Sequence, residues 1–340
     1  MSFRKSKRAL LVAALAGVLF LGKLIYPQAL PAQEISFYSN EETTEASGID
    51  IYTFFVNIVS EPFRFPLIGF VNIFRGSHTL PQIGFVNWNT GDFSSWQFGF
   101  VNTAGGDLNG VQAGFVNTAV GDTNGLQFGF LNTTRSFSGT QIGFVNTASR
   151  ESQGLQLGFV NTSMQTLSGM QIGFVNFVDS IENGIPIGFI SIVRQGGFRA
   201  VEYSFSEFFH FNIGLKLGVE RFYTTIFAAY NSVTEFDAEH FAIGLGFGTI
   251  IPITGSFFFN PELNNMSAFI NGGNRQFLSF VPYIGFNISQ RLSIAVAPSV
   301  TWTRTEDDYL PSPSFSMMEH TINDNNSIVA GARAAVRFRF

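Results

Sequence analysis

The chain has 340 residues, a formal net charge of −5 and no cysteine. The lack of cysteine excludes a lipid-modified cysteine anchor, a disulfide framework and thiolate metal sites, and the acidic balance gives no electrostatic case for nucleic-acid binding. Charged residues make up only 13% of the chain, whereas aromatic residues reach 16% and include 42 phenylalanines. This composition is typical of strands that face lipid or stack tightly and is unusual for soluble helices.

The N-terminus has the pattern of an export signal. Four basic side chains precede an uncharged, mostly apolar stretch at residues 9–22. A helix of that length reaches about 21 Å, short of the roughly 30 Å hydrocarbon core of a bilayer. We therefore predict a cleaved signal peptide over residues 1–32 and a polar linker over residues 33–50. The alternative is an uncleaved anchor helix that continues to Tyr26.

A tandem repeat fills residues 51–195. Its motif is Gly-x-Gln-(Ile/Leu/Phe)-Gly-Phe-(Val/Leu)-Asn-Thr, and its copies follow one another at steps of 15 residues, with one step of 14. Spacing this regular indicates a repeat architecture, and the atypical last copy is typical of a capping repeat. A glycine and an asparagine from each copy form the candidate structural ladder: Gly84, Gly99, Gly114, Gly129, Gly143, Gly158, Gly173, Asn87, Asn102, Asn117, Asn132, Asn146, Asn161 and Asn176. A glutamine ladder accompanies it: Gln82, Gln97, Gln112, Gln127, Gln141, Gln156 and Gln171.

Two architectures fit the repeat. In a β-solenoid, each copy is one coil with one clear strand, equal residues stack about 4.8 Å apart, asparagine and glutamine bond along ladders, and phenylalanine stacks inside. In a barrel wall, each copy is one strand of about ten residues followed by a turn. Successive turns of a barrel wall face opposite sides of the membrane, so a 30-residue super-period would be expected, and the sequence has none. The pattern favours the solenoid and keeps the barrel wall as the alternative.

Residues 196–340 follow a different rule, because apolar residues recur there with a period of two. One face of each segment is apolar and the other is small or polar, as a narrow lumen requires. We predict a roughly eight-stranded antiparallel β-barrel of the outer-membrane type; the alternative is a soluble β-sandwich. The strands are expected near residues 200–207, 209–219, 222–231, 241–251, 255–263, 277–288, 292–303 and 327–340. Long links are expected at residues 232–240, 264–276 and 304–326.

The C-terminal strand carries the sharpest signal of this half. Phe340, Phe338 and Val336 lie on one face of the strand, and Arg337 and Arg333 lie on the other. A terminal phenylalanine on an amphipathic last strand resembles the recognition signal of bacterial outer-membrane barrels. The expected partners are therefore outer-membrane lipid and the barrel-assembly machinery.

The tandem Gly-x-Gln-Ile-Gly-Phe-Val-Asn units resemble the leptospiral-type surface-repeat family of predicted exported bacterial proteins. The resemblance covers about residues 52–193. It implies a surface location and little chemistry. It leaves the phenylalanine-rich second half unexplained.

No catalytic, cofactor or metal site is expected. The four histidines (His78, His210, His240 and His320) do not have metal-ligand spacing, and no nucleophile motif is present. Lys216 and Glu220, with His210, are expected to face the barrel lumen, either as a charge network that plugs it or as part of a solute pathway. Glu306-Asp307-Asp308 is interpreted as a solvated loop, with a cation site as the alternative.

Two functions remain open. The favoured one is a non-enzymatic outer-membrane or cell-surface repeat protein with a structural or adhesive role toward an unknown envelope or extracellular partner. The alternative is an outer-membrane channel in which the repeats join the barrel wall. An even strand count places the repeats in the periplasm, whereas the family resemblance implies the cell surface.

Overall fold

A computed structural model describes residues 50–53, 55–231, 241–270, 273–305 and 313–340. Every regular element in these ranges is a β-strand, which confirms the predicted all-β fold class. Within the same ranges, no helix has the length and hydropathy needed to span a bilayer. The predicted signal peptide, the linker up to residue 49, His240 and the acidic residues 306–308 lie outside the described part of the chain.

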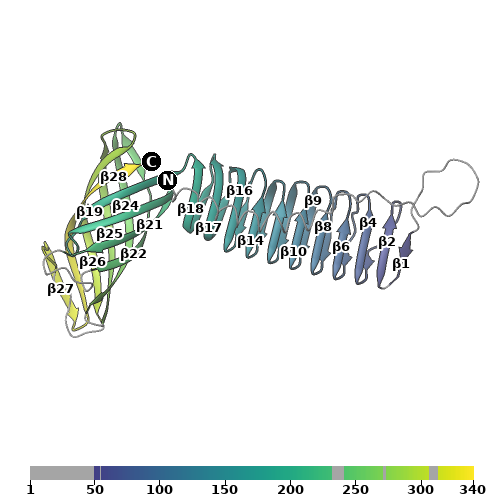
Figure 1. Cartoon of the computed structure of the whole chain (residues 1–340), viewed down its shortest axis with the longest axis horizontal. Coiled ribbons are helices and arrows are strands. Elements are labelled where there is room, and N and C mark those ends of the chain that lie inside the picture. The colour runs from purple at the N-terminus through teal and green to yellow at the C-terminus, as the bar shows by residue number, and fades with distance from the viewer. Residues whose placement is uncertain (1–49, 54, 232–240, 271–272, 306–312) are drawn as a thin grey trace, which may run out of the picture. The chain divides into compact units, whose positions relative to one another are not determined.

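The repeat forms a parallel β-solenoid, confirming the favoured architecture. Figure 1 shows its strands stacked in a row from β1 in purple to β18 in teal. Equal positions of successive copies are register partners; for example, Asn102 pairs with Asn117 and Gln112 with Gln127. The barrel-wall alternative is wrong, because these strands pair with one another in parallel at one-copy steps.

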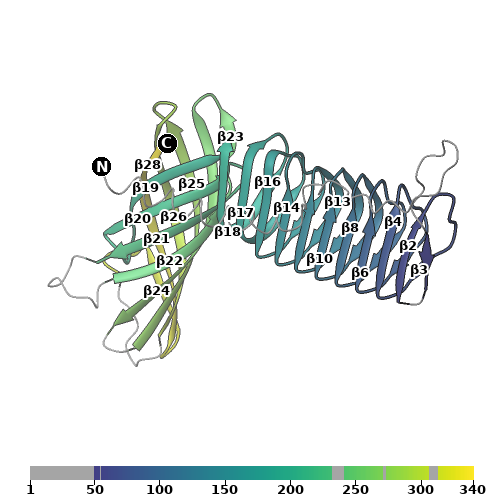
Figure 2. The ribbon, with the colours of Figure 1, turned by 45° about the vertical axis from the view of Figure 1, so that its right-hand side comes forward.

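The solenoid strands are β1 (Ile51–Tyr52), β2 (Val56–Ser60), β3 (Leu67–Ile68), β4 (Val71–Arg75), β5 (Gln82–Ile83), β6 (Val86–Asn89), β7 (Trp96–Phe98), β8 (Val101–Ala104), β9 (Leu108–Ala113), β10 (Val116–Ala119), β11 (Thr123–Phe128), β12 (Leu131–Thr134), β13 (Phe137–Ile142), β14 (Val145–Ala148), β15 (Leu155–Leu157), β16 (Val160–Leu167), β17 (Met170–Ile181) and β18 (Ile185–Gln195). Even-numbered strands β2 to β16 stack on one side of the coils and odd-numbered strands β3 to β15 on another, as Figure 2 shows from an oblique angle. Strand β17 pairs with both β15 and β16, and β1 caps the other end by pairing antiparallel with β2.

Most coils contain two strands, so the prediction of one clear strand per copy is wrong. Strand β9 ends at Ala113, the pair Gly114-Phe115 forms a bend, and β10 begins at Val116. The bend interrupts the alternation that the sequence pattern suggested. The one 14-residue step is absorbed in a loop between coils, because Thr123 still pairs with Phe137 across it.

The glycine at the bend is required by space rather than by backbone torsion. A Cβ atom built on Gly129 would lie 2.0 Å from the carbonyl oxygen of Gly114 and 2.5 Å from Nδ2 of Asn117. Both distances are far below van der Waals contact. The same crowding recurs along the repeat, so the Gly and Asn ladders of the motif depend on each other.

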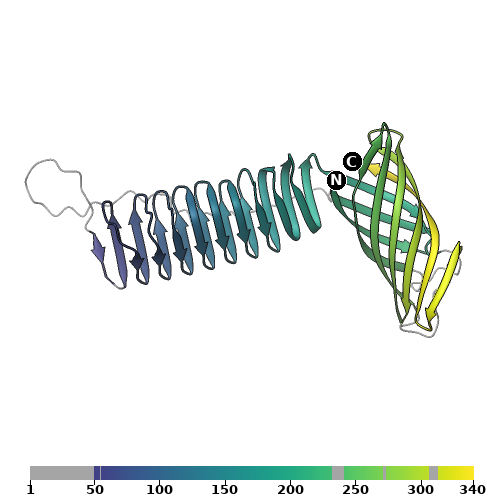
Figure 3. The same ribbon diagram turned by 180° about the vertical axis from the view of Figure 1, so that it is seen from behind.

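The second half forms a closed eight-stranded antiparallel barrel, as predicted; Figure 3 shows it from behind. Its wall consists of β19 (Phe198–Phe205), β20 (Phe211–Val219), β21 (Phe222–Tyr230), β22 (Phe241–Gly248), β24 (Phe257–Ile270), β25 (Gly273–Asn287), β26 (Leu292–Thr305) and β28 (Asn326–Arg339). Two short strands, β23 (Ile251–Thr254) and β27 (Met318–Asn323), pair with β24 and β28. The barrel closes where β19 pairs with β28, from Ala200 opposite Arg339 to Phe205 opposite Ala334.

Two predicted links are wrong in part, because the one at residues 304–326 contains β27 and the one at residues 264–276 is mostly strand. The link predicted at residues 232–240 lies outside the described residues. Residues 264–276 were expected to form a long loop, but most of them continue β24 and β25, which pair from Phe257–Phe286 up to Ile270–Gly273. The polar residues that suggested a loop include Asn264, which is buried in the barrel interior. A polar residue on the lumen side of a strand is therefore the reason for the error.

Replacing Gly129 with alanine is expected to destabilise the solenoid by several kcal/mol, because either the Gly114 carbonyl or the Asn117 amide must move out of its ladder. The measurement is urea unfolding of the full chain followed by tryptophan fluorescence in a Trp302→Phe background, where the remaining tryptophans lie in the solenoid. The exposed Asn124→Ala change is the matched control and should shift stability by less than about 0.5 kcal/mol. Equal midpoints for the two variants would contradict the role of the glycine.

Candidate interaction and membrane surfaces

The asparagine ladder lies inside the solenoid and is fully buried from Asn57 to Asn176. From Asn57 to Asn161, each Nδ2 donates to the Oδ1 of the asparagine one copy later, at 2.7–3.0 Å, and Asn176 donates to Ser191. The same Nδ2 also donates to a backbone carbonyl of the next coil, as Asn87 does to Phe98 at 2.9 Å. Both N–H groups of the amide are therefore used, and the buried polar groups are satisfied.

The glutamine ladder runs beside it with the opposite polarity. Each Nε2 donates to the Oε1 of the glutamine one copy earlier, at 2.6–2.8 Å, for example from Gln112 to Gln97. The ladder stops at Gln171, whose Oε1 has no protein partner, because Pro186 occupies the next position. The predicted ladder residues thus lie in the interior of the solenoid.

The phenylalanine of the motif does not stack inside the coil, so that expectation is wrong. The rings stack along the solenoid but on its outside, and Phe115 and Phe130 keep 46% and 45% of their surface exposed. The reason is strand alternation: Gln112 points inside, so Phe115, three residues later, points to the opposite face.

His78 is the one histidine of the solenoid. It is buried at 3% exposure and its ring stacks on Phe74 at 4.2 Å. Burial lowers the pKa of His78 from 6.5 to about 4. It occupies the position of Phe93 in the next coil, with which it forms a parallel bridge. No group of three or more His, Asp or Glu side chains in the described ranges is placed to hold a metal ion.

The barrel has an apolar outside. Large apolar side chains on alternate wall positions are 37–65% exposed: Tyr203, Phe205, Phe211, Ile213, Leu215, Ile243, Phe247, Leu263, Leu278, Phe280, Ile284, Ile294, Val296, Val300, Val336 and Phe338. The predicted assembly-signal residues Phe338 and Val336 belong to this face, and the terminal Phe340 is 64% exposed. Arg333 and Arg337 occupy alternate positions of β28, and their side chains point into the lumen and are buried.

A charge network fills the middle of the lumen. Lys216 Nζ lies 2.6 Å from Glu262 and 3.2 Å from Glu202. Arg337 lies 2.6 Å from Glu202 and 3.4 Å from Glu262, and Tyr223 donates to Glu262. Two cations face two carboxylates, so the network is neutral, and its members are at most 7% exposed.

Lys216 therefore lies in the lumen, as predicted, but Glu220 does not. Glu220 lies at the turn after β20, about half exposed, and pairs with Arg339 at 2.7 Å. His210 stacks on Phe205 at 5.3 Å, outside the network. Arg337 lies on the polar face of its strand, as predicted, but Glu202, Glu262 and Tyr223 were missed, because pairs such as Lys216 and Glu262 are 46 residues apart. Their only sequence signal is a charge or a hydroxyl at an inward position of a strand.

The link between β19 and β20 folds into the lumen. Glu207 is fully buried, accepts hydrogen bonds from Ser299 and Thr301, and lies 3.6 Å from Arg333. Phe208 and Phe209, next to it, pack against Phe277 with ring centroids 5.0 and 5.3 Å apart. Between this plug and the charge network lies a cavity of about 20 Å³, roughly the room of one water molecule.

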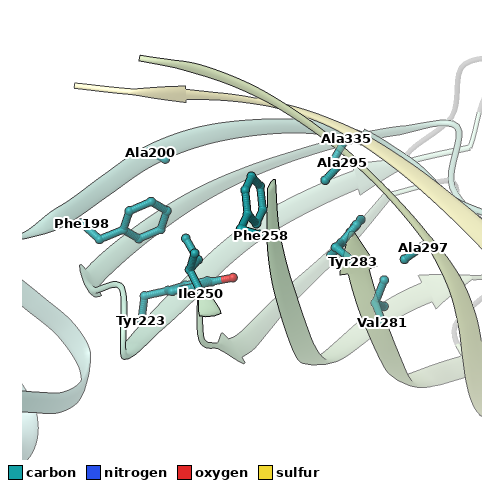
Figure 4. Packing of buried hydrophobic residues seen from close by; sticks show 10 residues of the cluster. All are labelled: Phe198, Ala200, Tyr223, Ile250, Phe258, Val281, Tyr283, Ala295, Ala297 and Ala335. Carbon is teal, nitrogen blue, oxygen red and sulfur yellow. The ribbon is translucent and has the colours of Figure 1, made fainter. Parts of the chain in front are cut away.

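The other end of the lumen is closed by apolar side chains. Figure 4 shows the rings of Phe198, Tyr223 and Phe258 pointing into the barrel opposite small alanines of β26 and β28. Space is tight, because a Cβ atom on Gly285 would lie 2.0 Å from the Phe258 ring. The lumen is therefore packed along its length by side chains.

No protein-family model and no curated protein matches the chain. Among solved structures, the chain is similar to Neisserial surface protein A, with 10% sequence identity and a TM-score of 0.25, over 42% of this chain and 94% of that chain. A likeness at this identity and TM-score supports no argument about function. The resemblance of the repeat to the leptospiral-type surface-repeat family stays a prediction.

Acid is expected to destabilise the solenoid through His78. Its folded-state pKa of about 4 lies below the unfolded value of 6.5, so the unfolded chain binds the proton first. Stability is then lost as the pH falls from 6.5 to 4, by about 3 kcal/mol, and the loss levels off below pH 4. Urea unfolding of the wild type and of His78→Phe, each compared with its own value at pH 8, measures this loss. A wild-type profile as steep as that of the variant would show that His78 contributes nothing.

Proposed function

We propose that the chain is an outer-membrane protein whose barrel is a closed anchor and whose solenoid is a binding element in the periplasm. The observation that carries the membrane assignment is the inverted polarity of the barrel. Its charges lie inside and its large apolar side chains lie outside, as a wall surrounded by lipid requires. In water the same wall would expose an apolar surface far larger than soluble monomers carry.

The packed lumen supports an anchor rather than a pore. The charge network, the inserted Glu207 link and the apolar end leave no aqueous path comparable to that of wide porins. Separating the Lys216 and Glu262 ion pair inside the barrel would cost several kcal/mol. The anchor therefore stays closed unless a large rearrangement supplies that energy.

The strand order supports the proposed periplasmic position. The N-terminal end of β19 pairs with the C-terminal end of β28, so the solenoid joins the barrel at the end that also carries the C-terminus. The short turns after β20 and β25 lie at that end as well. Outer-membrane barrels keep their short turns in the periplasm. The exposed Phe340 lies at the same end of the barrel.

The first test is electrical. Purified full-length chain, inserted into planar bilayers, is expected to show no conductance above that of the bare bilayer. The matched variant Glu207→Gly/Phe208→Gly/Phe209→Gly opens only one end of the lumen, so it should also stay silent, because the charge network and the apolar end still close the barrel. Heat-modifiable migration on gels verifies that the variant is folded. Long-lived steps from the wild type would overturn the closed anchor and favour a channel.

A second experiment tests on which side of the outer membrane the solenoid lies. The chain lacks cysteine, so a single Asn124→Cys is the only target of a membrane-impermeant maleimide. We expect labelling only after the outer membrane is permeabilised. Labelling of intact cells would place the solenoid on the cell surface instead.

A further inference from the structure

The outside of the solenoid carries a continuous apolar stripe. Its first row is one phenylalanine per coil: Phe55, Phe70, Phe85, Phe100, Phe115, Phe130, Phe144, Phe159, Phe174 and Phe189. Neighbouring rings stack with centroids 4.8–5.2 Å apart and planes within 6° of parallel. The first nine rings are 43–65% exposed. A row this regular presents the same surface at every coil.

A second row lies two residues earlier in each copy. Ile68, Ile83, Phe98, Phe128 and Leu157 belong to it and are 41–55% exposed. The glycines between the rows have no side chain, so a furrow separates the rows, and it is hollowed along the coils from Phe128 to Phe189. We call the two rows and the furrow the apolar stripe.

The stripe carries no charge. The acidic residues of the central coils lie in loops away from it, where Asp107 and Asp122 pair with Arg135. The stripe positions themselves are phenylalanine, isoleucine, leucine, alanine and glycine. A partner for this surface must therefore be apolar, long and straight.

The stacking of the rings further limits the class of partner that can bind the apolar stripe. The face of Phe115 is covered by Phe100 on one side and by Phe130 on the other. Only the ring edges point outward, so the stripe cannot offer aromatic faces to a sugar or a cation. It offers ridges and a furrow of hydrocarbon, which suit burial against a matching apolar surface.

A second copy of this chain supplies such a surface. A phenylalanine side chain buries about 200 Å² when fully covered, so nine half-exposed rings give about 800 Å² per copy. That is the area per partner of a standard, stable protein interface. A stripe that is uniform along its length and uncharged also matches itself across a two-fold axis without like-charge repulsion.

We infer that the apolar stripe is a homodimer interface, in which the stripes of two copies of this chain pack against each other. The inference rests on the proposed function in one respect, because two barrels in one membrane hold their solenoids on the same side at high effective concentration. The contact itself depends only on the solenoid.

The test uses single cysteines in outer membranes of expressing cells. With a short bismaleimide cross-linker, Phe115→Cys is expected to give a covalent dimer, and Asn124→Cys, exposed on the same coils but outside the stripe, is expected to give at least tenfold less. Adding Phe130→Asp to Phe115→Cys should reduce the dimer at least tenfold, whereas adding Asn109→Asp should not. The solenoid tryptophan fluorescence verifies that each variant is folded.

Three results would overturn the inference. They are equal cross-linking at the stripe and control positions, a cross-link from Phe115→Cys to a different protein, and a wild-type mass in mild detergent that is monomeric and unchanged by Phe130→Asp. These outcomes are separate from the fate of the proposed function. Long-lived channel conductance with an intact dimer would contradict only the proposal of a closed anchor. Bilayers without conductance and a chain without a dimer would contradict only the proposed interface.

Discussion

The pairing of β19 with β28 closes a ring of backbone hydrogen bonds, and the barrel depends on that closure. A closed ring leaves no unpaired strand edge, so the wall can stand in lipid. Because side chains alternate along each strand, the closure also divides them into two environments. Arg337 and Val336 are neighbours in sequence, yet one lies in a neutral charge network and the other on the outer face.

The solenoid must satisfy the hydrogen-bonding groups of its buried side chains, and it does so by repetition. Its interior contains amides, which are costly to bury unless every N–H and C=O finds a partner. Repetition provides these partners, because an asparagine such as Asn117 always lies one coil from an identical asparagine. The motif glycine provides the space, and the motif phenylalanine lies on the outside. Both halves of the chain therefore bury polar side chains beside apolar clusters and carry large apolar side chains on the outside, which inverts the usual polarity of a protein surface.

This inversion explains which features could be predicted from the sequence. A fixed 15-residue spacing implies equal surroundings for every copy, and that was enough to predict a stack with amide ladders. Period-two alternation with a terminal Phe340 was enough to predict an eight-stranded barrel. Strict alternation puts Gln112 and Asn117, five residues apart, on opposite faces, but both are buried, because the Gly114-Phe115 bend resets the alternation between them. The network of Glu202, Lys216, Glu262 and Arg337 was not predictable, since only closure of the barrel brings these strands together.

The central claim is that the outward face of the wall contacts hydrocarbon. Spin labels placed singly at Ile294, Val296 and Val300 of β26, in full-length chain reconstituted into vesicles, report this directly through collisions with oxygen or with a water-soluble nickel reagent. Oxygen concentrates in hydrocarbon, so these three positions should relax mainly through oxygen, whereas a label at Asn124 in the solenoid should relax mainly through nickel. Relaxation of the three wall positions through nickel, to the extent seen at Asn124, would contradict the membrane assignment.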